Sequence, residues 1–114
     1  RFERFYAPAD SSHVSHSIAN LQKTSQYFEA ELKTLKSLMG ERGHSSVDLL
    51  KIDVEGAEYE VLDHLLSQSI LPLILCVEFD QPAPLWRTAR YAQRLRAAGY
   101  AAVKVDGYNV TFVL

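Results

Sequence analysis

Hydrophobic and polar residues follow two different periods along this chain, and each change of period marks the boundary of a predicted element. The runs 48–54 and 71–79 are predominantly apolar, as expected of strands that are covered on both faces of a sheet. After each run the apolar residues recur every three or four positions, over about 57–68 and 84–98, which predicts amphipathic helices. The order strand, helix, strand, helix indicates an α/β protein with a parallel sheet.

The chain closes on a predicted hairpin. Residues 101–106 and 109–114 are rich in strand-forming side chains, and the turn signal Asp106-Gly107 ends the first of them. Such a hairpin adds one antiparallel strand to a sheet that is otherwise parallel. We therefore expect a mostly parallel sheet with a terminal antiparallel hairpin at one side.

The first third of the chain is less regular. Residues 1–6 form a short aromatic run that Pro8 breaks, and residues 27–33 alternate loosely between apolar and polar side chains, so both segments predict short strands. The segment between them is dense in serine and histidine and predicts a loop. Thr34 is a suitable N-cap for a short helix that Gly43 would end.

Composition narrows the class of protein. With 114 residues, 47% hydrophobic and 23% charged, the chain lies in the ordinary range for one soluble domain. A net charge of -2 offers no basic field for nucleic acid. The longest apolar stretch, 70–77, is far shorter than the roughly 20 residues that span a bilayer, and no signal peptide is visible. The single cysteine, Cys76, excludes an intrachain disulfide, and the absence of a methionine at Arg1 leads us to expect a fragment or a processed product.

Two acids stand where the first buried strand is predicted to end. Asp53 and Glu55 come at the end of this run, and Gly56 then precedes the predicted helix. Ligands of open α/β sheets bind outside the carboxyl ends of the strands, so a carboxylate here can orient a nucleophile or accept its proton. Because side chains alternate along a strand, Asp53 and Glu55 are expected to share one face. The simpler alternative is that one of them caps the helix.

A third acid, Glu78, lies at the end of the next predicted strand. If the two strands are neighbours, about 4.8 Å apart, Glu78 lies beside Asp53 across the crevice. Carboxylates that close hold a proton, a cation or an acceptor hydroxyl between them. The alternative is a solvated acid at the junction of a strand and a loop.

Two further clusters have simpler interpretations than the functional ones. His13 and His16 have the spacing H-x-x-H, which indicates a metal site only together with further ligands, so an ordinary polar loop is preferred. Four arginines and no acid lie on the predicted helix 84–98, beside Trp86. Stacking aromatics among basic side chains are typical of nucleic-acid surfaces, but the slightly acidic chain favours a solvated outer face.

The stretch 48–62, DLLKIDVEGAEYEVL, resembles the FkbM-type methyltransferases, which depend on S-adenosylmethionine. The resemblance extends from about Phe5 to Leu114 and implies the C-terminal half of the class I methyltransferase fold, which is Rossmann-like. It implies methyl transfer to an oxygen, such as a hydroxyl of a sugar or another small metabolite. It also implies that Asp53 faces the methionine end of the cofactor or the acceptor, and that a loop carrying His16 folds over the pocket.

The five glycines, at positions 40, 43, 56, 99 and 107, are too far apart to form the G-x-G turn that usually cradles a nucleotide-type cofactor. We therefore expect residues 1–114 to be one partial methyltransferase domain, inactive alone, whose cofactor-binding half lies upstream of Arg1. Two alternatives stay open. One is a binding or structural module without catalysis, and the other is a hydrolase that holds Mg²⁺ through Asp53, Glu55 and Glu78.

Overall fold

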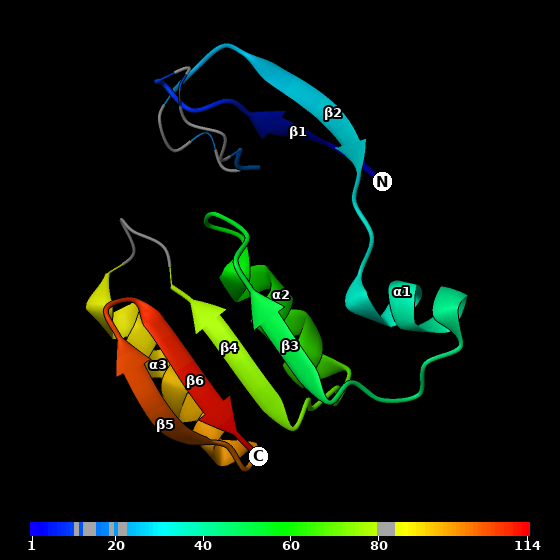
Figure 1. The fold of residues 1–114 in the computed structure, drawn as a ribbon, viewed down its shortest axis with the longest axis vertical. Helices are drawn as coiled ribbons and strands as arrows, with labels where there is room; N and C mark the ends of the chain where they lie inside the picture. The colour runs from blue at the N-terminus through cyan, green and yellow to red at the C-terminus, as the bar shows by residue number, and fades with distance from the viewer. Residues whose placement is uncertain (11, 13–15, 19, 21–22, 80–83) are drawn as a thin grey trace.

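A computed structural model describes residues 1–10, 12, 16–18, 20, 23–79 and 84–114 of the chain (Figure 1). Strands and helices follow in the order β1 Phe2–Tyr6, β2 Tyr27–Glu31, α1 Leu35–Arg42, β3 Leu49–Ile52, α2 Glu58–Ser67, β4 Ile74–Glu78, α3 Leu85–Ala97, β5 Ala101–Asp106 and β6 Asn109–Val113. Among the described residues, none of the helices combines the length and the apolar character that a bilayer crossing requires.

The central feature is a four-stranded sheet in the order β3-β4-β6-β5. Strands β3 and β4 are adjacent and parallel, with Leu49 opposite Ile74 and Ile52 opposite Val77. Strands β5 and β6 form an antiparallel hairpin, and β6 also pairs antiparallel with β4. The predicted parallel neighbours and the predicted hairpin at one side are both confirmed.

The sheet is mixed, which corrects the expectation of a mostly parallel sheet. Strands β3, β4 and β5 run in the same direction, but β6 runs the opposite way and separates β4 from β5. In the part of the chain that the structure describes, β3 and β4 are therefore the only hydrogen-bonded pair of this sheet that is parallel. The cause is the tight turn at Gly107, whose φ of 59° reverses the chain and returns β6 beside β5.

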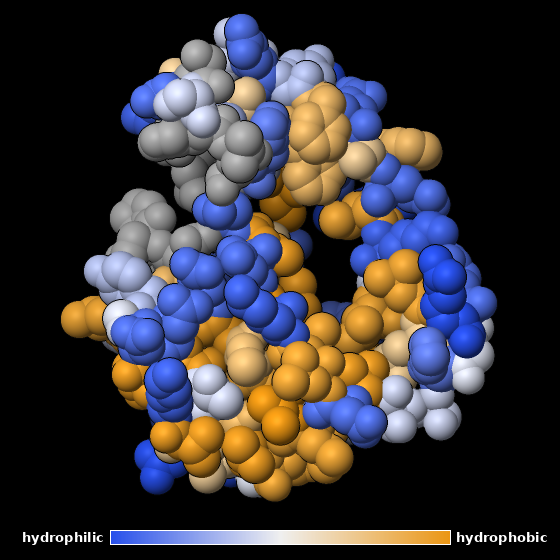
Figure 2. Space-filling view, viewed as in Figure 1, coloured by the Kyte–Doolittle hydropathy of each residue, from blue (hydrophilic) through white to orange (hydrophobic). Residues whose placement is uncertain are grey.

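Helices α2 and α3 cover one face of this sheet (Figure 1). The buried core between helices and sheet consists of Ile52, Tyr59, Leu62, Leu65, Leu75, Val77, Phe79, Tyr91, Leu95, Tyr100 and Phe112. Side chains alternate along each strand, so Leu75 and Val77 point into this core while Ile74 of the same strand is exposed. Apolar residues accordingly gather on the surface over the sheet in Figure 2. The sequence predicted strands covered on both faces of the sheet. In the part of the chain that the structure describes, the helices cover one face of it.

The N-terminal strands form a separate two-stranded antiparallel sheet. Phe5 and Phe28 lie opposite each other in register, and their rings stack at 5.2 Å between centroids. A linker then leads from β2 to α1, where Thr34 accepts a hydrogen bond from the backbone N–H of Ser37 at 3.2 Å and so caps the helix as predicted. Helix α1 ends at Gly43, in the left-handed conformation with a φ of 70°.

Candidate functional site

Two acids meet at the carboxyl edge of the parallel pair. Glu78 is the last residue of β4, and Asp53 directly follows Ile52, the last residue of β3. Because Ile52 lies opposite Val77, the next residue on each strand brings the two carboxyl groups together. Their side chains lie close enough for the charge of Asp53 to act on Glu78.

The local charges make Glu78 a better proton acceptor than an ordinary glutamate. The negative charge of Asp53 raises the pKa of Glu78 most, followed by desolvation and by the hydrogen bond with Asp53. The charge of Glu55 raises this pKa further, whereas Lys51 lowers it. The net shift is upward, so the half-buried Glu78 binds a proton more tightly than a solvated glutamate does.

The backbone between β3 and α2 turns sharply at Glu55. This residue has a φ of 50° and the following Gly56 a φ of 102°, so both lie outside the conformations that side chains favour. The expectation that Asp53 and Glu55 share a face by strand alternation does not apply, because β3 ends at Ile52 and alternation holds only along extended chain. Glu55 still acts on the acid pair through its charge.

Helix α2 begins without the acid cap that the sequence left open as an alternative. Its N-cap is Ala57, which makes no side-chain capping hydrogen bond. The nearby Glu58 is instead fully buried, and its Oε2 accepts a hydrogen bond from the backbone N–H of Gly56 at 2.9 Å. Sequence reasoning missed this residue. The available signal was its position four residues before Leu62 and seven before Leu65, which places a carboxylate on the buried face of the helix.

The serine-rich N-terminal segment reaches the same turn through Ser17. Its side chain is buried, and its hydroxyl donates a hydrogen bond to the backbone carbonyl of Glu55. His16, the predicted acceptor contact, packs its ring against Phe28 at 5.1 Å between centroids. His13 lies outside the described residues. The segment therefore contacts the strand-end turn through its serine, and a contact of His16 with a substrate stays a prediction.

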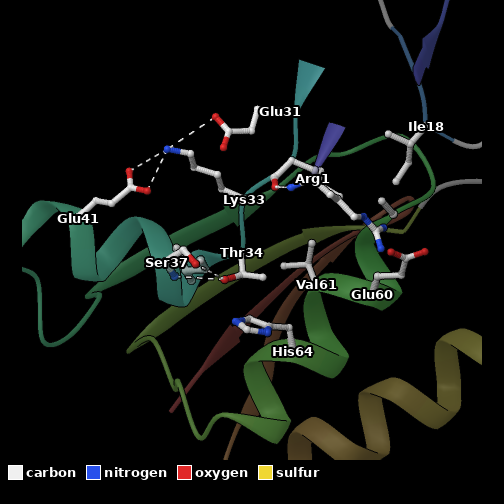
Figure 3. Close-up of a pocket in the computed structure, with 13 residues that line it drawn as sticks. Arg1, Ile18, Glu31, Lys33, Thr34, Ser37, Glu41, Glu60, Val61 and His64 are labelled. Atoms are coloured by element: carbon white, nitrogen blue, oxygen red, sulfur yellow. Dashed lines mark hydrogen bonds and ion pairs between the residues drawn. The ribbon is translucent and has the colours of Figure 1, made fainter. Parts of the chain in front are cut away.

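A cavity of about 590 Å³ lies between the linker 32–34, helix α1 and helix α2 (Figure 3). Lys33 at its rim is bound to Glu41 at 2.9 Å and lies 3.9 Å from Glu31. Figure 3 shows His64 of α2 beside Thr34, and its Nε2 is buried with no hydrogen-bond partner among the described residues. The described lining does not include the three acids at the strand ends, so this cavity is distinct from them.

The described residues contain no group of three or more His, Cys, Asp or Glu placed to hold a metal ion. Asp53, Glu55 and Glu78 are therefore not such a group within the part of the chain that the structure describes.

Comparison with known proteins finds related sequences. Residues 3–101 match the family described as Methyltransferase FkbM domain. The human and rat proteins named "Probable methyltransferase-like protein 24" are each 40% identical over 42 residues, which is 37% of this chain and 12% of each relative. The aligned part thus spans a small share of those relatives, and no solved structure matches the chain. Because the family match extends over most of the sequence and includes the turn that carries the acids, the chain belongs to the FkbM methyltransferase domain family.

Proposed function

We propose that this chain supplies the proton-accepting side of an S-adenosylmethionine-dependent O-methyltransferase. The acceptor is a hydroxyl group of a sugar or another small metabolite. Membership of the FkbM methyltransferase family supports the reaction class. The observation that carries the proposal is the juxtaposition of Asp53 and Glu78 at the carboxyl ends of adjacent parallel strands.

Methyl transfer to a hydroxyl requires a base, because the oxygen loses its proton as it forms the new bond to carbon. S-adenosylmethionine, when bound, supplies an electrophilic methyl group attached to a positively charged sulfur. Within this chain, the ionised carboxylate of Glu78 accepts the acceptor's proton, and the neighbouring charge of Asp53, which raises the pKa of Glu78, makes it a stronger base. A positioned base of this kind contributes about 10² to 10⁴-fold in rate.

The residues of this chain fit one part of the cofactor better than another. The acids at the strand ends suit its charged methionine end, whereas the sequence has no G-x-G turn for the backbone contacts of the nucleoside end. We therefore propose that the 114 residues bind S-adenosylmethionine weakly or not at all when they are tested alone.

Two titrations on one sample test this. Calorimetry of the chain with S-adenosylmethionine is expected to give no saturable heat at micromolar concentrations, and the same holds for Mg²⁺. A micromolar affinity for the cofactor would show that its site is misplaced here. Saturable Mg²⁺ binding that Asp53→Asn abolishes would favour the hydrolase alternative.

Activity is tested in a longer polypeptide that joins this chain to a glycine-rich cofactor turn. Transfer of a labelled methyl group from S-adenosylmethionine is measured on a panel of hydroxylated sugars and small metabolites, with amines as the matched control. O-methylated products are expected. Labelling of amines alone would overturn oxygen as the acceptor, and a folded, cofactor-binding protein that labels nothing would favour the binding module.

A further inference from the structure

One peptide group in the turn between β3 and α2 is held at both of its ends. The carbonyl oxygen of Glu55 accepts a hydrogen bond from the Ser17 hydroxyl. The N–H of Gly56 donates a hydrogen bond to Oε2 of Glu58 at 2.9 Å. This carbonyl and this N–H belong to the same planar peptide unit, in which they point in opposite directions. Two side chains therefore fix the orientation of one peptide plane.

This peptide joins the two residues of the turn with positive φ. Glu55 is at 50° and Gly56 at 102°. Glycine adopts such values readily, but a glutamate does so only where the surroundings hold it. Loss of these hydrogen bonds would free ψ of Glu55 and φ of Gly56, so that the turn could rearrange and carry the Glu55 carboxylate to another position. The two hydrogen bonds oppose that rearrangement.

Both partners of the peptide are themselves firmly placed. Glu58 is fully buried at the start of α2, where a carboxylate is stabilised by hydrogen bonds and by the positive end of the helix. Ser17 is 9% exposed and is fixed to β1 through two backbone hydrogen bonds with Tyr6, of 2.7 and 3.1 Å. The N-terminal hairpin is thus connected to the acid-bearing turn across 38 residues of sequence.

We propose that Ser17 and Glu58 are positioning residues that hold the Glu55–Gly56 peptide and thereby place Asp53 and Glu55 against Glu78. The importance of this positioning for catalysis rests on the function proposed above. The positioning itself is a property of the chain without cofactor. Ser17 and Glu58 act through the peptide, and neither is assigned a contact with substrate.

Two NMR measurements on the labelled chain test the proposal. The first is hydrogen exchange of the Gly56 amide, and the second is the pH titration of the Glu78 carboxyl carbon. Glu58→Ala should speed exchange of Gly56 by about tenfold or more, because the amide loses a hydrogen bond to a charged group. Ser17→Ala should speed it less. In both variants the pKa of Glu78 should fall toward its ordinary value, because the acids that raise it move away.

Two further variants separate positioning from general damage. Glu58→Gln keeps an oxygen that accepts from Gly56 and should restore slow exchange. Ser12→Ala is the matched serine control, because Ser12 lies in the same segment but its hydroxyl bonds to the exposed Asp10. Neither measurement should change in this control. If Glu58→Ala fails to fold, Ser17→Ala and Glu58→Gln decide the question.

The proposal is overturned if Ser17→Ala leaves both the exchange of Gly56 and the titration of Glu78 at their wild-type values. It is also overturned if exchange accelerates while Glu78 titrates unchanged, because the hydrogen bonds would then stabilise the turn without placing the acids. Neither readout requires cofactor or methyl transfer. The experiments therefore distinguish a failure of Ser17 and Glu58 to position the peptide from a failure of the proposed function.

Discussion

Asp53 and Glu78 lie side by side at the ends of adjacent parallel strands. The charge of Asp53, then desolvation, raises the pKa of Glu78. The protonation of Glu78 therefore depends on the charge of Asp53. Three expected outcomes follow for substitutions at these two positions.

Asp53→Asn should lower the pKa of Glu78, since it removes the largest cause of the upward shift. The measurement is the carbon NMR titration of the Glu78 carboxyl in both proteins. Asp63→Asn is the control, because Asp63 lies on α2 and its carboxylate pairs with Arg94 at 2.5 Å. An unaltered titration of Glu78 in the Asp53 variant would show that the two acids do not interact in solution.

Glu78→Gln should stabilise the chain relative to wild type at neutral pH and have little effect at acid pH. A raised pKa means that the folded state binds the proton more tightly than the unfolded state. Stability is therefore lost as the pH rises from the ordinary value of about 4.5 through the higher folded value. Thermal unfolding of both proteins at pH 4 and pH 7 measures this. A gap in melting temperature that shrinks with rising pH would contradict it.

In the longer polypeptide described above, Asp53→Asn should reduce turnover by about 10²-fold or more, while its stability changes by about 1 kcal/mol or less. Asparagine keeps the size and hydrogen-bonding capacity of aspartate but removes its charge. Glu78→Gln should act similarly, and the double variant should lose less than the product of the two single effects, because both acids serve one acceptor. Near-normal turnover in Asp53→Asn would remove its catalytic role.

At the scale of elements, α2 and α3 are joined by an apolar contact with a polar rim. The rings of Tyr59 and Tyr91 pack at 4.8 Å between centroids. Asp63 accepts hydrogen bonds from the Tyr91 hydroxyl at 2.9 Å and from Arg94 at 2.5 Å. Arg87 lies 4.1 Å above the ring of Tyr59. Two of the four arginines of α3 therefore contact α2, and the interpretation of this helix as a solvated outer face stays a prediction.

Leu62→Ala and Asp63→Ala, both on α2, should lower the free energy of unfolding by very different amounts. Leu62 is fully buried, so its truncation leaves a cavity and should cost about 2–5 kcal/mol. Asp63 keeps 53% of its side chain exposed, so loss of its ion pair should cost about 1 kcal/mol or less. Urea unfolding of the two variants checks this order. Equal losses would mean that the Asp63 contacts hold the helices together as strongly as the apolar core does.

The elements themselves could be read from the sequence because their periods are strong. Helix α2 lies within the predicted 57–68, and the hairpin turns at 107–108, of which Gly107 belongs to the predicted turn signal. Strand β4 begins only at Ile74, since Pro72 has no N–H for the ladder and lies before the strand. The mixed pairing and the contact between Ser17 and Glu55 left no local pattern, because they join segments that are far apart in sequence.

The candidate site was predictable in part from the sequence. Strand ends point to Asp53 and Glu78, because parallel neighbours finish at one edge. The left-handed backbone of Glu55 and the buried carboxylate of Glu58 depend on the folded turn, so residue type alone did not reveal them.

At the scale of the whole molecule, the two sheets differ in how much they bury. Neither β1 nor β2 contains a fully buried residue, whereas β3, β4 and β6 all contribute to the core. The hairpin β1–β2 is held by aromatic stacking and by the Ser17 contact. Local opening requires little energy where few apolar contacts are lost.

Backbone amides of β1 and β2 should therefore exchange with solvent faster than those of β4, by orders of magnitude. Hydrogen exchange followed by mass spectrometry measures both regions in one sample. Ser17→Ala should accelerate exchange in the hairpin further and leave β4 unchanged. Equal protection of the two regions would show that the chain opens as one cooperative unit.

Strand β3 has a consequence for handling the protein. It lies at the edge of its sheet, so in the described chain one side of its backbone has no strand partner, and its first residue, Leu49, is 59% exposed. A bare strand edge next to apolar side chains is a template on which further chains add by β-pairing. Concentrated solutions of these 114 residues should aggregate through that edge. Lys51→Pro removes one backbone donor from β3 and should therefore slow the growth of aggregates.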